Sequence, residues 1–224
     1  MLYEFHQGHS LQKATENIVS TYGDKKWVMF KNIRTYNQWL DPGQRPIGVP
    51  WINRFQRKAL LCVWWNKIGG VYFELLDEGQ VVNSEVYCRQ LEAVNQQLIE
   101  NGFNPASIRF IHDNARPHVS RVTQAKLKDL NWHVLPHAPY SPDLAPSDYH
   151  LFSSLEHSLR DTEFDDLEQL ENWIHQFFES KHPDFYERGL KDLVRRWRSV
   201  VKSESEYIID QWLFLRVFYS IKKT

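Results

Sequence analysis

The segment Ile108-Arg109-Phe110-Ile111-His112-Asp113-Asn114 places an acidic residue just after a short apolar run. Its β-branched and aromatic residues predict a buried strand over residues 108–111. Asp113 then stands just past the end of that strand, where the functional groups of open α/β sheets gather. The segment therefore predicts an α/β fold with an acidic functional group at one edge of a sheet.

The regions on either side alternate between predicted strands and helices. Further β-rich runs predict strands over residues 27–30, 59–65, 70–76 and 132–135, the second and third of these joined as a hairpin. Helical spacing and capping residues predict helices over residues 84–101 and 123–130, and from Leu151 onward. This order resembles a ribonuclease H-like fold, in which helices flank a mixed central sheet. A fold alone does not fix a function.

Three spaced aspartates suggest a site for divalent metal ions and a phosphodiester. Asp24 lies in Gly23-Asp24-Lys25-Lys26-Trp27, Asp113 follows the quoted strand, and Asp148 begins a predicted helix after a Pro-rich loop. Mg²⁺ takes oxygen ligands and is usually held by a few carboxylates together with substrate phosphate and water. The alternative is structural, since aspartate also caps turns and helix starts.

Composition limits the class of protein. The 224 residues suffice for one sizeable core, and the two cysteines, Cys62 and Cys88, form no CxxC or Cys/His cluster. A disulfide framework and a structural zinc site are therefore not indicated, and a reducing, intracellular compartment is expected. No apolar run approaches the roughly 20 residues of a membrane span, which predicts a soluble protein without a membrane partner.

Charge is distributed unevenly, although the formal net charge is only −1. Between Lys25 and Lys67 the charged residues are mostly basic, and tryptophans are interleaved with them, among them Trp27, Trp39, Trp51 and Trp64. This combination suits phosphate contacts and base stacking. A solvated sheet face with core tryptophans explains the same pattern equally well. The acidic stretch over residues 161–171 indicates only an exposed helix face.

Two longer motifs narrow the function. The blocks over residues 112–118 and 140–152, His112-Asp113-Asn114-Ala115-Arg116-Pro117-His118 and Tyr140-Ser141-Pro142-Asp143-Leu144-Ala145-Pro146-Ser147-Asp148-Tyr149-His150-Leu151-Phe152, closely resemble the second and third catalytic blocks of mariner-family DNA transposases in sequence and spacing. The resemblance extends over about four-fifths of the chain, from residues 39–44 through 61–65 and 131–137 to Arg195-Arg196-Trp197.

The resemblance implies a metal-dependent DNA transposase that cuts DNA and pastes it into TA sites. It implies Asp24, Asp113 and Asp148 as the catalytic and metal-binding residues, with two Mg²⁺ or Mn²⁺ ions. The implied partners are double-stranded DNA, as transposon ends and TA target, and a second copy in a homodimer. A nuclear location is implied, and no small-molecule substrate.

Other polar residues of these blocks have weaker functional claims. We expect His112 to be a packing residue, and Asn114 to orient the neighbouring carboxylate. Asp143, between prolines, is expected to stabilise a turn. Arg116 and His118 are interpreted either as contacts to DNA phosphate or as solvated loop residues.

The beginning of the chain departs from the family pattern. Residues 1–22 resemble the opening of the family's first helix-turn-helix without its recognition helix, residues 23–210 the catalytic domain, and residues 211–224 an atypical extension. This order predicts an internal deletion that impairs recognition of transposon ends. It also makes the role of Asp24 as a metal ligand an open prediction, because Lys25 replaces the family's usual glutamate. Residues 17–21 suit either a replacement strand or a helix, and a helix would displace Asp24.

Two functions from different classes therefore remain. One is a transposase catalytic domain that cleaves DNA and transfers strands. The other is a catalytically dead remnant that binds DNA or dimerises with intact relatives. A nuclease acting on RNA·DNA hybrids shares the metal chemistry but lacks support from the two blocks.

Overall fold

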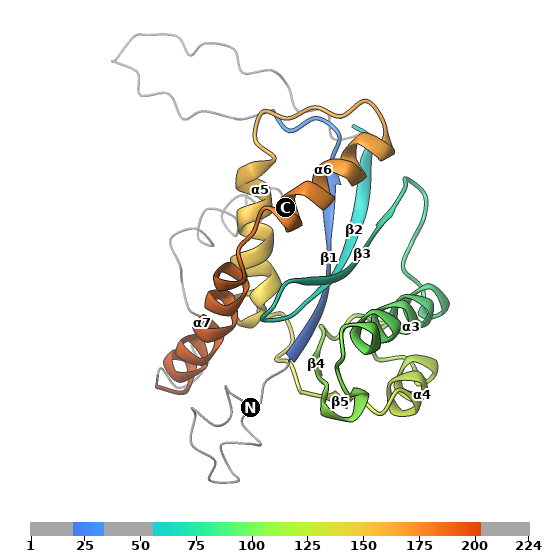
Figure 1. Cartoon of the computed structure of the whole chain (residues 1–224), viewed down its shortest axis with the longest axis vertical. Coiled ribbons are helices and arrows are strands. Elements are labelled where there is room, and N and C mark those ends of the chain that lie inside the picture. The colour runs from blue at the N-terminus through green and yellow to red at the C-terminus, as the bar shows by residue number, and fades with distance from the viewer. Residues whose placement is uncertain (1–19, 34–55, 203–224) are drawn as a thin grey trace.

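The computed structural model describes residues 20–33 and 56–202. In this part of the chain, five strands form one mixed sheet with the spatial order β3-β2-β1-β4-β5 (Figure 1). The strands are β1 (Ser20–Met29), β2 (Lys58–Trp65), β3 (Gly70–Leu76), β4 (Arg109–Ile111) and β5 (His133–Val134). Residues 1–19 and the predicted extension over residues 211–224 lie outside the described residues.

The first three strands form an antiparallel meander, and the last two run parallel to β1. β2 pairs antiparallel with both β1 and β3, and the predicted hairpin between β2 and β3 is confirmed. β4 pairs parallel with β1, and β5 parallel with β4. Because parallel strands need a long crossover, the chain inserts a helix before each of β4 and β5.

The beginning of β1 shows which of the two predictions for residues 17–21, strand or helix, holds from Ser20 onward. The strand runs from Ser20 to Met29, which extends the predicted strand over residues 27–30 toward the N-terminus. It pairs with β4 through Ser20↔Arg109 and Tyr22↔Ile111. Residues 20–22 therefore belong to the sheet, although the sequence placed the start of the catalytic domain at residue 23.

Helices cover both faces of this sheet. α3 (Ser84–Glu100) and α4 (Arg121–Asp129) pack on one face, and α5 (Ser153–Ser158), α6 (Leu167–Glu179) and α7 (Pro183–Lys202) pack on the other (Figure 1). Short 3₁₀ turns occur at η1 (Pro105–Ser107) and η2 (Pro142–Leu144), and a π-helix, η3 (Ser147–Phe152), precedes α5. The side chains of Asn83 and Ser120 cap α3 and α4 by accepting from backbone N–H groups.

Two apolar cores result, one on each face, and β2 joins them. Alternate β2 residues such as Leu61 and Trp65 pack under α5–α7, whereas Cys62 and Trp64 pack under α3 and α4. Every β2 residue after Lys58 is buried, as expected of a strand covered on both faces. Both cysteines are buried and unpaired.

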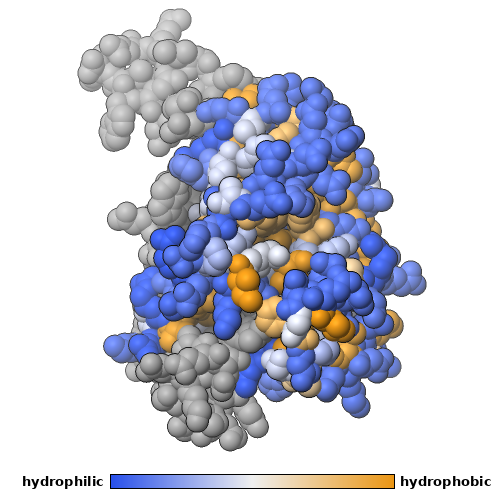
Figure 2. Space-filling model, in the orientation of Figure 1, coloured by the Kyte–Doolittle hydropathy of each residue, from blue (hydrophilic) through white to orange (hydrophobic). Residues whose placement is uncertain are grey.

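The surface is mainly hydrophilic where the described residues are seen. Figure 2 shows one face of the molecule, on which hydrophobic residues appear only as scattered patches among charged and polar ones. No helix within residues 20–33 and 56–202 is both long enough and apolar enough to cross a membrane.

Gly23 is required by the close approach of a tryptophan to β1. A Cβ atom at residue 23 would lie 2.5 Å from Nε1 and 2.8 Å from Cδ1 of Trp64, which is buried in the core. We expect Gly23→Ala to lower the free energy of unfolding by about 1–3 kcal/mol because the core would be overpacked. Urea denaturation measures the change. Gly69→Ala is the control, because its added Cβ would meet its nearest neighbour at 3.9 Å; equal stability of both variants would contradict the prediction.

Candidate metal centre

The register of two parallel strands brings Asp24 and Asp113 to the same level of the sheet. Tyr22 of β1 pairs with Ile111 of β4, and both side chains belong to the core under α5–α7. Each aspartate stands two residues further along, on the same face, because side chains of an extended chain alternate between faces. The pairing therefore places the two carboxylates side by side at the carboxyl end of β4.

Asp24 lies inside β1 rather than at its end. Its partner in β2 is Val63, and its Oδ1 accepts a hydrogen bond of 2.8 Å from the backbone N–H of Lys25. The residue is half-buried. The pairing of β1 with β2 thus fixes the backbone position of this carboxylate.

Asp113 is held by the turn that follows β4. Its Oδ1 accepts a hydrogen bond of 2.9 Å from the backbone N–H of Ala115, and Nδ1 of His118 lies 2.5 Å from the same oxygen. The Asp113 side chain is 44% exposed, whereas that of His118 is only 3% exposed. One carboxylate oxygen is therefore committed to the protein, and the other is left for a ligand.

Asp148 lies in the first turn of the π-helix η3. Such helices are rare and occur frequently at functional sites. Its neighbour Ser147 is fixed to the sheet, because Nε1 of Trp65 donates a buried hydrogen bond of 3.0 Å to its Oγ. The backbone N–H of Asp148 donates to the carbonyl of Ala145 at 2.9 Å, which joins η3 to the preceding turn.

α7 also holds η3 in place. Tyr149 donates a hydrogen bond of 2.8 Å to the carbonyl of Gly189, and Nε2 of His150 lies 2.7 Å from the carbonyl of Phe185. A Cβ at Gly189 would meet the His150 ring at 2.5 Å, so only glycine permits this approach.

The buried side chain of Arg196, in α7, contacts both η3 and the preceding turn η2. Its guanidinium carbon lies 4.0 Å from the centre of the Tyr149 ring, and its Nη1 donates to the carbonyl of Asp143 at 3.2 Å. Nε donates to Asp192 at 2.7 Å, which balances the buried charge. The position of Asp148 thus depends on contacts with β2 and with α7.

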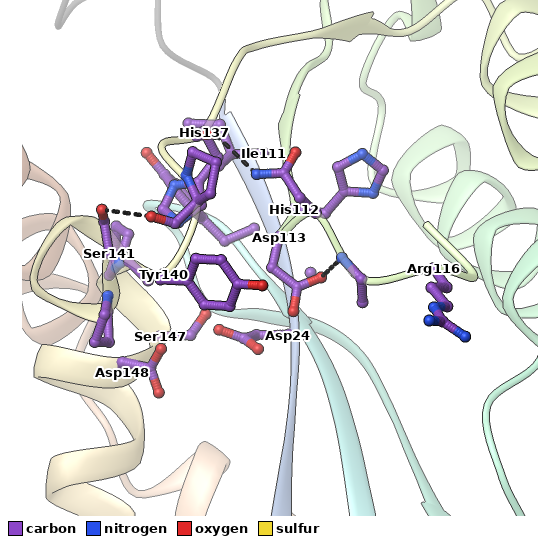
Figure 3. A pocket seen from close by; sticks show the side chains of 18 residues that line it. Asp24, Ile111, His112, Asp113, Arg116, His137, Tyr140, Ser141, Ser147 and Asp148 are labelled. Atoms are coloured by element: carbon purple, nitrogen blue, oxygen red, sulfur yellow. Dashed lines mark hydrogen bonds between the residues drawn. The ribbon is translucent and has the colours of Figure 1, made fainter. Parts of the chain in front are cut away.

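One cavity of about 470 Å³ brings the three aspartates together. Figure 3 shows their side chains extending from β1, from the segment after β4 and from η3. The wall also contains half-buried and exposed polar groups, among them Arg116 and Tyr140. Within residues 20–33 and 56–202, no three acidic, histidine or cysteine side chains form a compact ligand cluster by themselves.

Burial and neighbouring groups shift the pKa values of two aspartates in the cavity. Burial raises the pKa of Asp24 well above its usual value, and the charge of Asp148 raises it further. The backbone hydrogen bond from Lys25 lowers this pKa, and the charge of Asp113 raises it. Burial also acts to raise the pKa of Asp113, but the hydrogen bond and charge of His118 outweigh it, and this pKa lies well below its usual range. A hard divalent cation suits such oxygen donors, because it relieves their mutual repulsion.

The structure bears on the expectations for three nearby residues and corrects one of them, that for His118. His118 is 2% exposed and contacts Asp113, so neither a phosphate contact nor a solvated loop position describes it. Asn114 donates to the carbonyl of His137 at 3.0 Å, a contact the sequence did not predict. His112 is a packing residue as expected: it is 7% exposed, and its Nδ1 lies 2.9 Å from the hydroxyl of Tyr87.

Comparison with known proteins identifies the family. A model of the transposase partial DDE domain matches residues 29–107, and a model of the HTH domain in Mos1 transposase matches residues 1–38. The crystal structure of the catalytic domain of Mos1 mariner transposase superposes with a TM-score of 0.72 at 36% identity, covering 88% of each chain. The chain belongs to the mariner transposase family.

Longer relatives extend this similarity. Mariner Mos1 transposase of Drosophila mauritiana is 42% identical over 190 residues, which are 83% of this chain and 55% of that protein. The human histone-lysine N-methyltransferase SETMAR is 36% identical over 190 residues, which are 82% of this chain and 27% of that protein. A Mos1 paired-end complex with the left transposon end matches with a TM-score of 0.82 at 40% identity. The chain spans about half the length of the first relative, and about a quarter of the second.

The shifted pKa of Asp24 predicts how the transposase domain responds to pH. The folded state holds the Asp24 proton more tightly than the unfolded chain does. Ionisation of Asp24 therefore lowers the free energy of unfolding. This loss develops as pH rises from the ordinary aspartate pKa, about 3.9, to the raised pKa of the folded state. We therefore expect Asp24→Asn to be more stable than wild type at pH 8 in EDTA. This advantage should shrink toward pH 4, where both residues are neutral. Urea denaturation at both pH values measures it, and an advantage that grows toward pH 4 would contradict the assignment.

Proposed function

We propose that this chain acts as a transposase catalytic domain that cleaves DNA and transfers strands, with divalent metal ions held by Asp24, Asp113 and Asp148. The observation that carries the proposal is the Tyr22↔Ile111 pairing, which sets Asp24 beside Asp113 in the cavity that Asp148 also lines. The alternative of a dead remnant required a displaced Asp24. The strand from Ser20 onward therefore favours the enzyme.

The metal ions are inferred from the donor set and from relatives. Paired-end complexes of Mos1 have been determined with Mn and with Mg, and these match at TM-scores of 0.83 and 0.82. In this chain, Oδ2 of Asp113 and the carboxylates of Asp24 and Asp148 are the oxygens that would hold Mg²⁺ or Mn²⁺. Two such ions would activate the attacking oxygen and stabilise the leaving oxygen of an in-line displacement.

The protein's own groups would position the DNA. Arg116 is exposed at the cavity wall, where it can bind a phosphate. In the reaction, water would cleave a phosphodiester at the transposon end and free a 3′ hydroxyl. That hydroxyl would then attack a phosphodiester at a TA target and displace its 3′ oxygen.

The wider assembly belongs to the same proposal. The proposed assembly is a homodimer bound to double-stranded DNA in the nucleus. Its DNA partner and its dimeric state are supported by the similarity to a Mos1 paired-end complex with the left transposon end. Residues 1–22, as a helix-turn-helix remnant, would recognise transposon ends poorly, and residues 211–224 would be an extension. End recognition is then the impaired step, while the cleavage chemistry is retained.

Cleavage of a pre-nicked duplex carrying a transposon end tests the chemistry. We expect product with Mg²⁺ or Mn²⁺ and none with EDTA, and we expect Asp24→Ala and Asp113→Ala each to abolish it by removing a ligand. Asp184→Ala, an acidic residue that is 74% exposed in its side chain and does not line the cavity, is the control. Cleavage that survives Asp113→Ala would refute the metal assignment, and a folded wild type without product would favour the remnant.

DNA binding should be weak and nearly independent of sequence. Contacts to phosphate release counterions, so we expect the affinity for a random duplex to fall steeply with salt. Such contacts carry no base information. Fluorescence anisotropy at 50–200 mM salt would measure both properties, with a mariner terminal repeat as the competing probe. A clear preference for the repeat would contradict impaired end recognition.

A further inference from the structure

Asp113 contacts a buried group of aromatic rings formed by His118, Tyr87 and His112. The His118 ring stacks on Tyr87 of α3 at a centroid distance of 4.0 Å and an interplanar angle of 21°, and it lies parallel to the His112 ring at 5.3 Å. The hydroxyl of Tyr87 lies 2.9 Å from Nδ1 of His112. These three residues are at most 7% exposed. His118 is therefore fixed in orientation by residues of α3 and of the segment after β4.

The backbone around His118 is equally constrained. Its N–H donates to the carbonyl of Ala115 at 2.8 Å, and the hydroxyl of Thr123 donates to the carbonyl of Pro117 at 2.6 Å. Ser120 caps α4 by accepting from the backbone N–H of Thr123. These contacts fix the backbone that carries His118, and the stacking on Tyr87 and His112 holds its ring.

This rigid imidazole meets one oxygen of Asp113. Nδ1 of His118 and the backbone N–H of Ala115 both contact Oδ1, at 2.5 and 2.9 Å. We assign a proton to Nδ1 of His118, because this nitrogen lies 2.5 Å from a carboxylate oxygen. With that proton in place, two donors meet on Oδ1, restrict rotation of the carboxylate and leave Oδ2 for a ligand. A freely rotating carboxylate would have to be ordered when a cation binds, and this ordering would weaken binding.

We propose that His118 is a positioning residue that holds Asp113 with Oδ2 presented to a divalent cation. This inference rests on the proposed metal site. Packing alone would explain the burial and the stacking of His118, but it would not require a donor at the Nδ1 position. The donor is thus the feature that separates positioning from packing.

Substitutions at His118 can separate the donor from the ring. The amide nitrogen of His118→Asn occupies nearly the place of Nδ1, whereas that of His118→Gln resembles Nε2 and cannot make the same contact. His118→Phe keeps the aromatic stack on Tyr87 but has no donor. The three variants form a matched set, in which only asparagine should replace the lost contact.

The test is Mn²⁺ binding to the whole chain, measured by electron paramagnetic resonance of free Mn²⁺, with thermal unfolding in EDTA as a check of folding. We expect His118→Phe and His118→Gln to weaken Mn²⁺ binding about 10- to 100-fold, and His118→Asn to recover most of the loss. Unchanged Mn²⁺ affinity in a folded His118→Phe or His118→Gln would overturn the proposal, as would equal losses in His118→Asn and His118→Gln.

Asp113→Ala distinguishes failure of this inference from failure of the proposed function. If Asp113→Ala binds Mn²⁺ as wild type does, the metal site itself is wrong, and the role of His118 falls with it. If Asp113→Ala loses binding while His118→Phe and His118→Gln retain it, the metal site stands and His118 is only a packing residue. The comparison of His118→Gln with His118→Asn remains valid even where His118→Phe does not fold.

Discussion

The parallel pairing of β1 with β4 is the constraint on which the candidate site depends. Its register sets Tyr22 opposite Ile111, and Asp24 and Asp113, each two residues further along, line the same cavity. A shift of one residue would turn one carboxylate to the other face of the sheet and bury it under α3 and α4. Gly23 is compatible with this packing, because the absence of a side chain leaves room for Trp64 beside the strand.

Asp148 reaches the same cavity by a different route. It lies in a π-helix that is tied to the sheet through Trp65 and Ser147 and to α7 through Tyr149 and Gly189. These contacts hold a carboxylate near two others. Burial is the largest cause of the raised pKa of Asp24, and the charge of Asp148 raises it further. The fold thus maintains a repulsive group of charges that a bound cation would stabilise, as sites organised for function commonly do.

The sequence predicted most of the fold from local patterns. The bounds of β3 agree with the prediction, α3 differs by its last residue, and β2 begins one residue earlier, at Lys58. β1 was the exception, since residues 17–21 suit both a strand and a helix and only the pairing with β4 decides for the part from Ser20 onward. Local strand propensity is a weak guide here, because the strand that pairs with β1 lies far away in the sequence.

The sequence by itself determined the residue types of the site, namely aspartates in two family motifs and one candidate upstream. Tertiary structure alone decided that Asp24 and Asp113 line one cavity, and that His118, expected either at a DNA phosphate or in a solvated loop, is buried against Tyr87. The reason is physical: the burial of His118 depends on Tyr87 of α3, a helix that is distant in sequence. A local motif names the groups available for chemistry, but the packing of separate elements sets which atoms of those groups face the cavity.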